Sequence, residues 1–166
     1  QPRAAQLGSE FYFPAYSSST GWELWKTNGT QAGTRLALDL TPGSLNFSLP
    51  CTIVALNNRL FFTAVDAQGA RKVWSSNGSV GGTQPIHTLS AGQRLGESFG
   101  PVVFGGALYF TTPVEDAALR GRLWRSSGAV GDATVVYEAA TPGGSITVPV
   151  AVGNRLVFTV ERPTGV

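Results

Sequence analysis

The chain has 166 residues, of which 42% are hydrophobic and only 13% are charged. This composition excludes an intrinsically disordered chain, because disorder goes with many charges and few apolar side chains. Twelve basic and 10 acidic residues give a net charge of +2, and the basic residues form no run, so no nucleic-acid-binding patch is expected. No apolar stretch reaches the ~18 residues that a membrane-spanning helix needs.

The single cysteine, Cys51, excludes an intrachain disulfide and a cysteine-based metal site. Cys51 begins an apolar run, where we expect a small buried hydrophobe. The chain begins at Gln1 and has no methionine, so we expect a processed product or a piece of something longer. Its 21 Gly and 10 Pro favour many short strands joined by turns.

The first repeat unit is expected over about residues 2–45. A strand is predicted over residues 2–7, followed by a turn at Gly8-Ser9 and the apolar triplet Phe11-Tyr12-Phe13. Residues 23–30, with the sequence ELWKTNGT, come next. The triplet and this octapeptide both recur along the chain, and together they mark the repeat.

The second unit, about residues 46–92, has the clearest strand pattern. We expect strands over Cys51–Leu56, Arg59–Val65, 71–75 and 84–89. They are separated by Asn57-Asn58, by residues 67–69 and by residues 77–82. Asn and Gly dominate these breaks because they tolerate the positive φ that tight hairpin turns need.

The third unit, about residues 97–143, repeats the pattern, with strands expected over 101–104, Ala107–Thr112, 120–125 and Thr134–Glu138. A half unit over about residues 145–166 supplies two more strands, 146–152 and 155–161, joined at Gly153-Asn154. Trp25 and Trp74 lie 49 residues apart, and Trp74 and Trp124 lie 50 apart. The apolar triplets keep spacings of 49, 48 and 48 residues, so two independent markers share one register.

Short strands joined by local hairpins predict an all-β fold, a β-propeller-type array of four-stranded antiparallel blades with about three and a half blades present. Strand cores such as residues 60–62 are apolar on both faces, which suits a sheet packed between two neighbours. A parallel β-helix is the alternative, although its period is usually shorter. Because a half blade leaves an open edge, we expect association with another chain, with further blades of the same protein or with copies of this chain.

Residues 23–34, 72–83 and 122–134 resemble a bacterial repeat named for its consensus Glu-Leu-Trp-x-x-Asp-Gly-Thr, which is followed by a second Gly-Thr. Gly29-Thr30 and Gly33-Thr34 match fully, the second unit matches nearly, and the third has Ala129 in place of Thr. The resemblance implies propeller-like arrays in large secreted or surface proteins, and hence a secreted or cell-surface location in a bacterium. It carries no catalytic residue over to this chain.

The repeated residues are interpreted as structural. Trp25, Trp74 and Trp124 are expected to pack between blades, and Gly29, Gly78 and Gly128 to form turns with a positive φ. A sugar-stacking role for these tryptophans is the alternative. The consensus Asp is replaced by Asn28, Asn77 and Ser127, so we expect the first two to cap their turns and no calcium, other metal or cofactor to bind.

Several features that the repeat does not explain are better candidates for function. Trp22 is matched by Arg71 and Gly121 in the other units, and Tyr16 adjoins the hydroxyl-rich residues 17–20. An insert at residues 45–49 and a longer loop at 93–100 enter the innermost strands, on the usual binding face of a propeller. We name Trp22, Tyr16, Arg94 and Glu97 as candidate residues for binding a carbohydrate or a peptide. A surface tryptophan without a ligand is the alternative for Trp22.

No catalytic constellation is identified. The single histidine, His87, is expected at an exposed position on an outer strand, and no nucleophile elbow accompanies it. Asp66 and Glu115-Asp116 fall in loops, and no two carboxylates form a convincing pair for glycoside hydrolysis. We therefore expect a non-enzymatic extracellular binding or scaffold module. The alternatives are a structural fragment that completes a larger propeller, and part of an enzyme whose catalytic residues lie mainly elsewhere.

Overall fold

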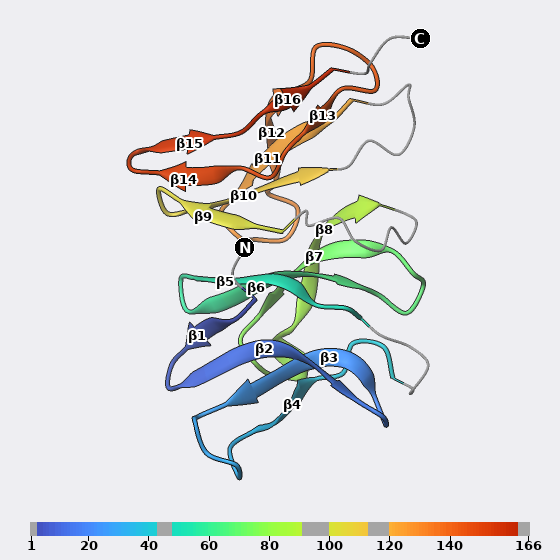
Figure 1. Cartoon of the computed structure of the whole chain (residues 1–166), viewed down its shortest axis with the longest axis vertical. Coiled ribbons are helices and arrows are strands. Elements are labelled where there is room, and N and C mark those ends of the chain that lie inside the picture. The colour runs from blue at the N-terminus through green and yellow to red at the C-terminus, as the bar shows by residue number, and fades with distance from the viewer. Residues whose placement is uncertain (1–2, 43–47, 91–99, 113–119, 163–166) are drawn as a thin grey trace.

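The protein is described by a computed structural model that covers residues 3–42, 48–90, 100–112 and 120–162. These residues form sheets that follow one another in chain order along the longest axis of the molecule (Figure 1). Every strand pair is antiparallel, and three sheets have four strands each, in the order in which the strands occur in the chain. The all-β fold and the four-stranded units are therefore confirmed.

The first sheet contains β1 (Ala5–Leu7), β2 (Glu10–Ser17), β3 (Gly21–Thr27) and β4 (Arg35–Leu38). The second contains β5 (Cys51–Leu56), β6 (Arg59–Val65), β7 (Arg71–Ser76) and β8 (Gln84–Ser90), with a 3-10 turn, η1 (Val80–Gly82), before β8. The third contains β9 (Val102–Phe104), β10 (Ala107–Thr112), β11 (Arg122–Ser126) and β12 (Thr134–Glu138).

The remaining strands are β13 (Ser145–Ile146), β14 (Val150–Val152), β15 (Arg155–Val157) and β16 (Val160–Glu161). We predicted two continuous strands here, and the structure divides each of them in two. β14 pairs with β15 and β13 with β16, and a bond from the Thr147 N–H to the Thr159 carbonyl (3.0 Å) continues the pairing between them. The half unit is thus one long hairpin with an interrupted ladder.

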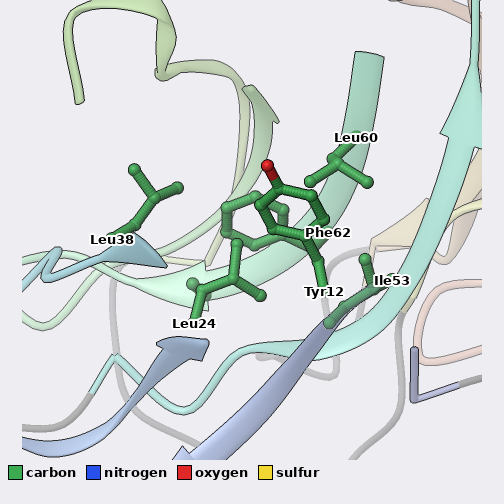
Figure 2. Packing of buried hydrophobic residues seen from close by; sticks show 7 residues of the cluster. Tyr12, Leu24, Leu38, Ile53, Leu60 and Phe62 are labelled. Atoms are coloured by element: carbon green, nitrogen blue, oxygen red, sulfur yellow. The ribbon is translucent and has the colours of Figure 1, made fainter. Parts of the chain in front are cut away.

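Each sheet has two apolar faces, as the sequence predicted. We call the face turned toward the next sheet in the chain the forward face and the opposite face the rear face. Figure 2 shows forward-face residues of the first sheet, such as Tyr12 and Leu24, packed against Leu60 and Phe62 on the rear face of the second. Phe61, the neighbour of both, points the other way and packs against the third sheet. The alternation along β6 therefore supplies two cores from one strand.

The strand that begins each unit lies close to its counterpart in the next unit. β1 contacts β5, β5 contacts β9, and β9 contacts β14. In Figure 1 these strands follow one another along one side of the array. The outer strands β4, β8 and β12 lie at the opposite edge of their sheets.

The repeated turn after the third strand is held by its own polar side chains. Asn28 Oδ1 accepts bonds from the backbone N–H of Thr30 (3.1 Å) and from its hydroxyl (2.7 Å), and that hydroxyl in turn accepts from the N–H of Gly33 (3.0 Å). Asn77 makes the same two bonds with Ser79 in the second unit. The capping role expected of both asparagines is confirmed.

Two different structural requirements select glycine at positions in this turn. Gly29, Gly78 and Gly128 have φ of +89°, +87° and +98°, the left-handed region that glycine adopts without strain. A Cβ at Gly33 would instead overlap the amide of Asn28, so this position needs glycine for space. The sequence pattern Asn-Gly-Thr-x-x-Gly is therefore a self-contained structural motif.

The third turn replaces the missing asparagine with Asp132. The Asp132 carboxylate accepts bonds from the Ser126 hydroxyl, the Ser127 hydroxyl (2.5 Å) and the Ser127 N–H (2.8 Å). Burial raises the pKa of Asp132, but these hydrogen bonds outweigh it and hold the pKa below its ordinary value. The Asp132 carboxylate thus holds the third turn, in which Ser127 stands at the position of Asn28 and Asn77.

Candidate functional site

A pocket of about 240 Å³ lies where the end of the first sheet meets the start of the second. It is lined by Arg3, Pro14, Trp22, Leu49, Pro50, Cys51 and Thr52. Arg3 precedes β1, and Pro14 and Trp22 belong to β2 and β3. Leu49 and Pro50 lead into β5, and Cys51 and Thr52 are its first two residues. The pocket therefore brings Trp22, which the repeat does not explain, against the start of β5, the first strand of the second sheet.

Trp22 and Tyr16 form an exposed aromatic pair at this end of the first sheet. They lie opposite each other on β3 and β2, with ring centroids 6.0 Å apart and an angle of 56° between the rings. Tyr16 is 59% exposed and Trp22 is 42% exposed, which is unusual for side chains of this size. The sequence prediction that these two residues lie together at the surface is confirmed.

The hairpin loop beside this pair is closed by hydroxyl groups. The Ser17 Oγ lies 2.6 Å from the Thr20 Oγ1 and 3.1 Å from the Ser19 Oγ, and it accepts a bond from the Thr20 N–H (3.1 Å). These internal bonds fix the loop that follows Tyr16. The aromatic pair is consequently held on a short, ordered hairpin end.

Glu23, next to Trp22, is fully buried, and its carboxylate organises the connection between the first two sheets. Oε2 accepts from the Leu40 N–H (3.0 Å) and the Ser48 hydroxyl (2.6 Å). Oε1 accepts from the Thr41 hydroxyl (2.7 Å) and the Ser48 N–H (3.2 Å). Four donors satisfy the buried carboxylate, as burial of a charged group requires.

Ser48 connects the buried Glu23 to the wall of the pocket. Besides its bonds to Glu23, its hydroxyl lies 3.3 Å from the Trp22 carbonyl oxygen, and its own carbonyl accepts from the Val65 N–H (2.7 Å). Ser48 is fully buried. The residues that follow it, 49–52, therefore enter β5 from a point fixed to both the first and the second sheet.

Two residues of this wall have a backbone conformation that their side chains disfavour. Leu49 has φ of +45° and the β-branched Thr52 has φ of +43°. A positive φ is a true outlier for such residues and costs of order 1–3 kcal/mol, and such outliers cluster at functional sites. The Thr52 side chain packs so tightly on Gly100 that a Cβ at position 100 would overlap it. The strain thus lies in the wall of the pocket and is held there by its surroundings.

Not every residue of the predicted site is brought together. Arg94 and Glu97 lie outside the described residues, as do the loop at 93–99, Glu115-Asp116 and most of the 45–49 insert. Cys51, expected to be buried, is half-buried and lines the pocket. Sequence reasoning missed Arg3 and Thr52 altogether, and no local pattern marks either of them.

The repeated tryptophans have structural positions. Trp74 is half-buried against the core between the first and second sheets, and its Nε1 donates to the Ala64 carbonyl (3.2 Å). Trp124 occupies the equivalent place between the second and third sheets, with its Nε1 donating to the Thr112 hydroxyl (3.3 Å). The interpretation of Trp74 and Trp124 as packing residues is confirmed. Trp25, on the first sheet, is half-buried but belongs to neither of these two core clusters, and Trp22 is exposed.

The expectation for His87 is wrong. β8 is an outer strand, but the imidazole is half-buried, with ring centroids 5.1 Å from Phe110 and 4.5 Å from Trp124 of the third sheet. The imidazole therefore lies on the forward face of its sheet. Burial lowers its pKa, and within the described ranges the imidazole makes no hydrogen bond to a serine or a carboxylate.

Asp66, a carboxylate outside the pocket, is engaged in structural bonds. Asp66 Oδ1 accepts from the N–H groups of Gln68 (3.0 Å) and Ala70 (2.8 Å), and Oδ2 pairs with Lys72 (2.5 Å). Asp66 lies in a strand-connecting turn, between β6 and β7, as expected, and it is buried there. In the part of the chain that the structure covers, no three His, Cys, Asp or Glu residues gather as metal ligands would.

Comparison of the chain with protein-family models, with curated proteins and with solved structures gave no match. The residues that the structure describes include no helix of the length and apolar character that a membrane crossing requires.

Proposed function

We propose that this chain is a segment of a β-propeller and serves as a non-enzymatic binding module, with the pocket beside Trp22 as its ligand site. The resemblance to the bacterial repeat with the Glu-Leu-Trp consensus is the basis for placing it outside the cell or on the cell surface. The ligand class that we propose is a carbohydrate or a peptide. The observation that carries the proposal is the exposure of Trp22 in a pocket, away from the packed tryptophans of the repeat.

The propeller arrangement is supported by the way the units approach one another. The first strands β1, β5, β9 and β14 are in contact in sequence, whereas the outer strands lie at the far edge. Sheets that converge on their first strands lie as blades do around an axis. In a propeller, the pocket would then lie between the first two blades, on the face where the chain enters the innermost strand of the second blade. Ligands of propellers commonly bind on this face.

The binding role is supported by the chemistry of the pocket. An exposed indole offers a flat apolar surface and an N–H donor, which suits the alternating CH and OH groups of a sugar or the side chains of a peptide. Glu23, Ser48 and the strained residue Thr52 fix one wall of the pocket in advance. A preformed wall lowers the entropy cost of binding.

Binding of the purified chain to arrays of glycans and of peptides tests this function. Trp22→Ala is expected to abolish the strongest binding while the far-ultraviolet circular dichroism and the melting temperature stay close to those of the wild type. Trp74→Phe, at a packed position, serves as the matched control and is expected to keep the ligand. Binding that survives Trp22→Ala, or loss of the fold in that variant, would contradict the proposed site.

A second candidate function rests on the rear face of the first sheet. Phe11 is 47% exposed there, whereas its counterparts Leu60 and Leu108 are fully buried under the preceding sheet. Gly29 likewise faces open space, whereas Gly78 and Gly128 each lie under an aromatic ring of the preceding sheet. An uncovered face of this kind favours a chain that completes a larger propeller with another chain or with its own copies.

Light scattering on the purified chain tests this second candidate. The wild type is expected to form a closed oligomer, and Phe11→Glu to lower its mass by placing a charge on the rear face. Gln84→Glu, on an exposed residue at the start of β8 in the second sheet, is the control for a general effect of charge. A stable and monodisperse monomer of 17.4 kDa would contradict assembly through copies of the chain.

A further inference from the structure

We propose that the ligand of the Trp22 pocket is an acidic carbohydrate, with the carboxylate of one uronic acid residue bound by Arg3 and its ring stacked on Trp22. This inference rests on the proposed binding function and narrows it to one ligand class. It follows from the charge, the size and the hydrogen-bonding character of the pocket.

Among the described residues that line the pocket, Arg3 alone is charged. Arg3 is exposed, and among the described residues it has no carboxylate partner. Glu10, a carboxylate of the first sheet, pairs with Lys26 and Arg35 instead. A guanidinium binds a carboxylate with two parallel N–H bonds, which fix the orientation of the bound group. The buried Glu23 carboxylate is already held by four donors and does not line the pocket.

The volume of the pocket favours one small unit of a larger ligand. Pockets for drug-sized ligands measure roughly 300–1,000 Å³, and this pocket, at about 240 Å³, lies below that range. One sugar ring with its carboxylate suits a site of this size. The neighbouring Tyr16, 59% exposed, extends the aromatic surface beyond the pocket for a second ring.

The lining favours a carbohydrate over a peptide. Pro14 and Pro50 have no backbone N–H, so two wall positions offer no donor to the main chain of a peptide. Because Pro14 lies within β2, the row of backbone N–H groups along this strand has a gap at the pocket. The other lining residues are Arg3, Trp22, Leu49, Cys51 and Thr52. The guanidinium of Arg3 matches a carboxylate, and the indole of Trp22 beside the apolar Leu49 matches the flat face of a sugar.

Titration calorimetry with a matched pair of sugars tests the inference. The probes are trigalacturonate and its fully methyl-esterified form, which has the same rings without the charges. We expect the wild type to bind trigalacturonate at least about tenfold more tightly than the ester, as loss of a charge-assisted pair implies. Arg3→Gln is expected to remove this difference, and Arg155→Gln, an exposed arginine on the last hairpin, to leave it unchanged.

The outcomes separate this inference from the proposed function. Equal binding of the acid and the ester, lost in Trp22→Ala, would overturn acid recognition and leave the binding module intact. Preference for an acidic peptide such as hexaglutamate over trigalacturonate would overturn the carbohydrate in favour of a peptide. Binding of none of these probes would overturn the inference, and a glycan and peptide array without any hit that depends on Trp22 would overturn the proposed function as well.

Discussion

The hydroxyl of Tyr12, on the first sheet, lies so close over Gly78, in the turn of the second, that a Cβ on that glycine would overlap it. Phe61 of the second sheet lies over Gly128 of the third in the same way. One aromatic residue of the first sheet and one of the second therefore lie against the turn glycine of the following sheet. At these two interfaces the contact joins the two markers of the repeat, the apolar triplet and the glycine turn.

Gly78→Ala is expected to destabilise the protein more than Gly29→Ala. Both glycines have nearly the same positive φ, which costs an alanine about 1–2 kcal/mol, but only the Cβ at position 78 meets Tyr12. Overpacking adds about 1–3 kcal/mol at that position. Urea unfolding of the two variants measures the difference, and equal losses of stability would show that the Tyr12 contact does not constrain the turn.

Glu23→Gln is expected to lower the free energy of unfolding by about 2–4 kcal/mol, because an amide group must face donors of Leu40, Thr41 and Ser48 in a buried site. Glu10→Gln is the matched control. Glu10 pairs with Lys26 near the surface, where solvent screens the pair, so its loss should cost much less than the loss of Glu23. Similar costs in denaturant unfolding of the two variants would mean that Glu23 does not anchor the connection.

Asp132 makes the stability of the third turn depend on pH. Because the pKa of Asp132 is below its ordinary value of 3.8 in the folded chain, its contribution is present above that value and is lost as the pH falls through the folded pKa. Asp132→Asn should therefore destabilise the protein at pH 7, by about 1–2 kcal/mol, and much less at the acid end. Thermal melts from pH 7 to pH 2 measure both curves, and parallel curves would refute this role.

His87 makes a separate contribution near neutral pH. Burial lowers its pKa from 6.5, so the unfolded chain binds a proton before the folded chain does. Stability should fall as the pH drops through 6.5 toward the lower folded pKa, and then level off. His87→Gln should lose this step. If the wild type and the variant show the same pH dependence of melting between pH 8 and pH 5, the imidazole is not buried against Phe110 and Trp124.

Much of the strand pattern could be predicted because short-range chemistry determines it. β6 begins and ends where predicted, since Asn57 and Asn58 adopt φ of +50° and +57° before it and a glycine turn follows it. Period-two alternation then assigns Phe61 and Phe62 to opposite cores. These features need only neighbouring residues, and a single sequence carries them.

The rest depends on contacts between segments far apart in the chain. Glu23 is bound by donors 17 to 25 residues further on, and nothing near it marks that arrangement. One signal was available, because the other units have Lys72 and Arg122 at this position, and a reversed charge inside a repeat indicates a different partner. The half-burial of His87 depends on Phe110 and Trp124, which lie 23 and 37 residues further along the chain. The β7–β8 pairing beside it also has two register shifts, which cannot be derived from composition.

The candidate site was predicted in part. Trp22 and Tyr16 could be found because they break the repeat, and departures from a repeat are visible in one sequence. Arg3 and Thr52 could not, because they reach the pocket through the pairing of β1 with β2 and through the entry into β5.

The most direct test of the account is fluorine NMR of the chain with 5-fluorotryptophan at its four tryptophans, with Trp22→Phe used to assign one resonance. We predict that trigalacturonate shifts the Trp22 resonance and leaves those of Trp74 and Trp124 in place. We also predict that a soluble paramagnetic agent broadens the Trp22 resonance most. A ligand-induced shift at Trp74 or Trp124 with Trp22 unchanged would contradict the assignment of function to this pocket.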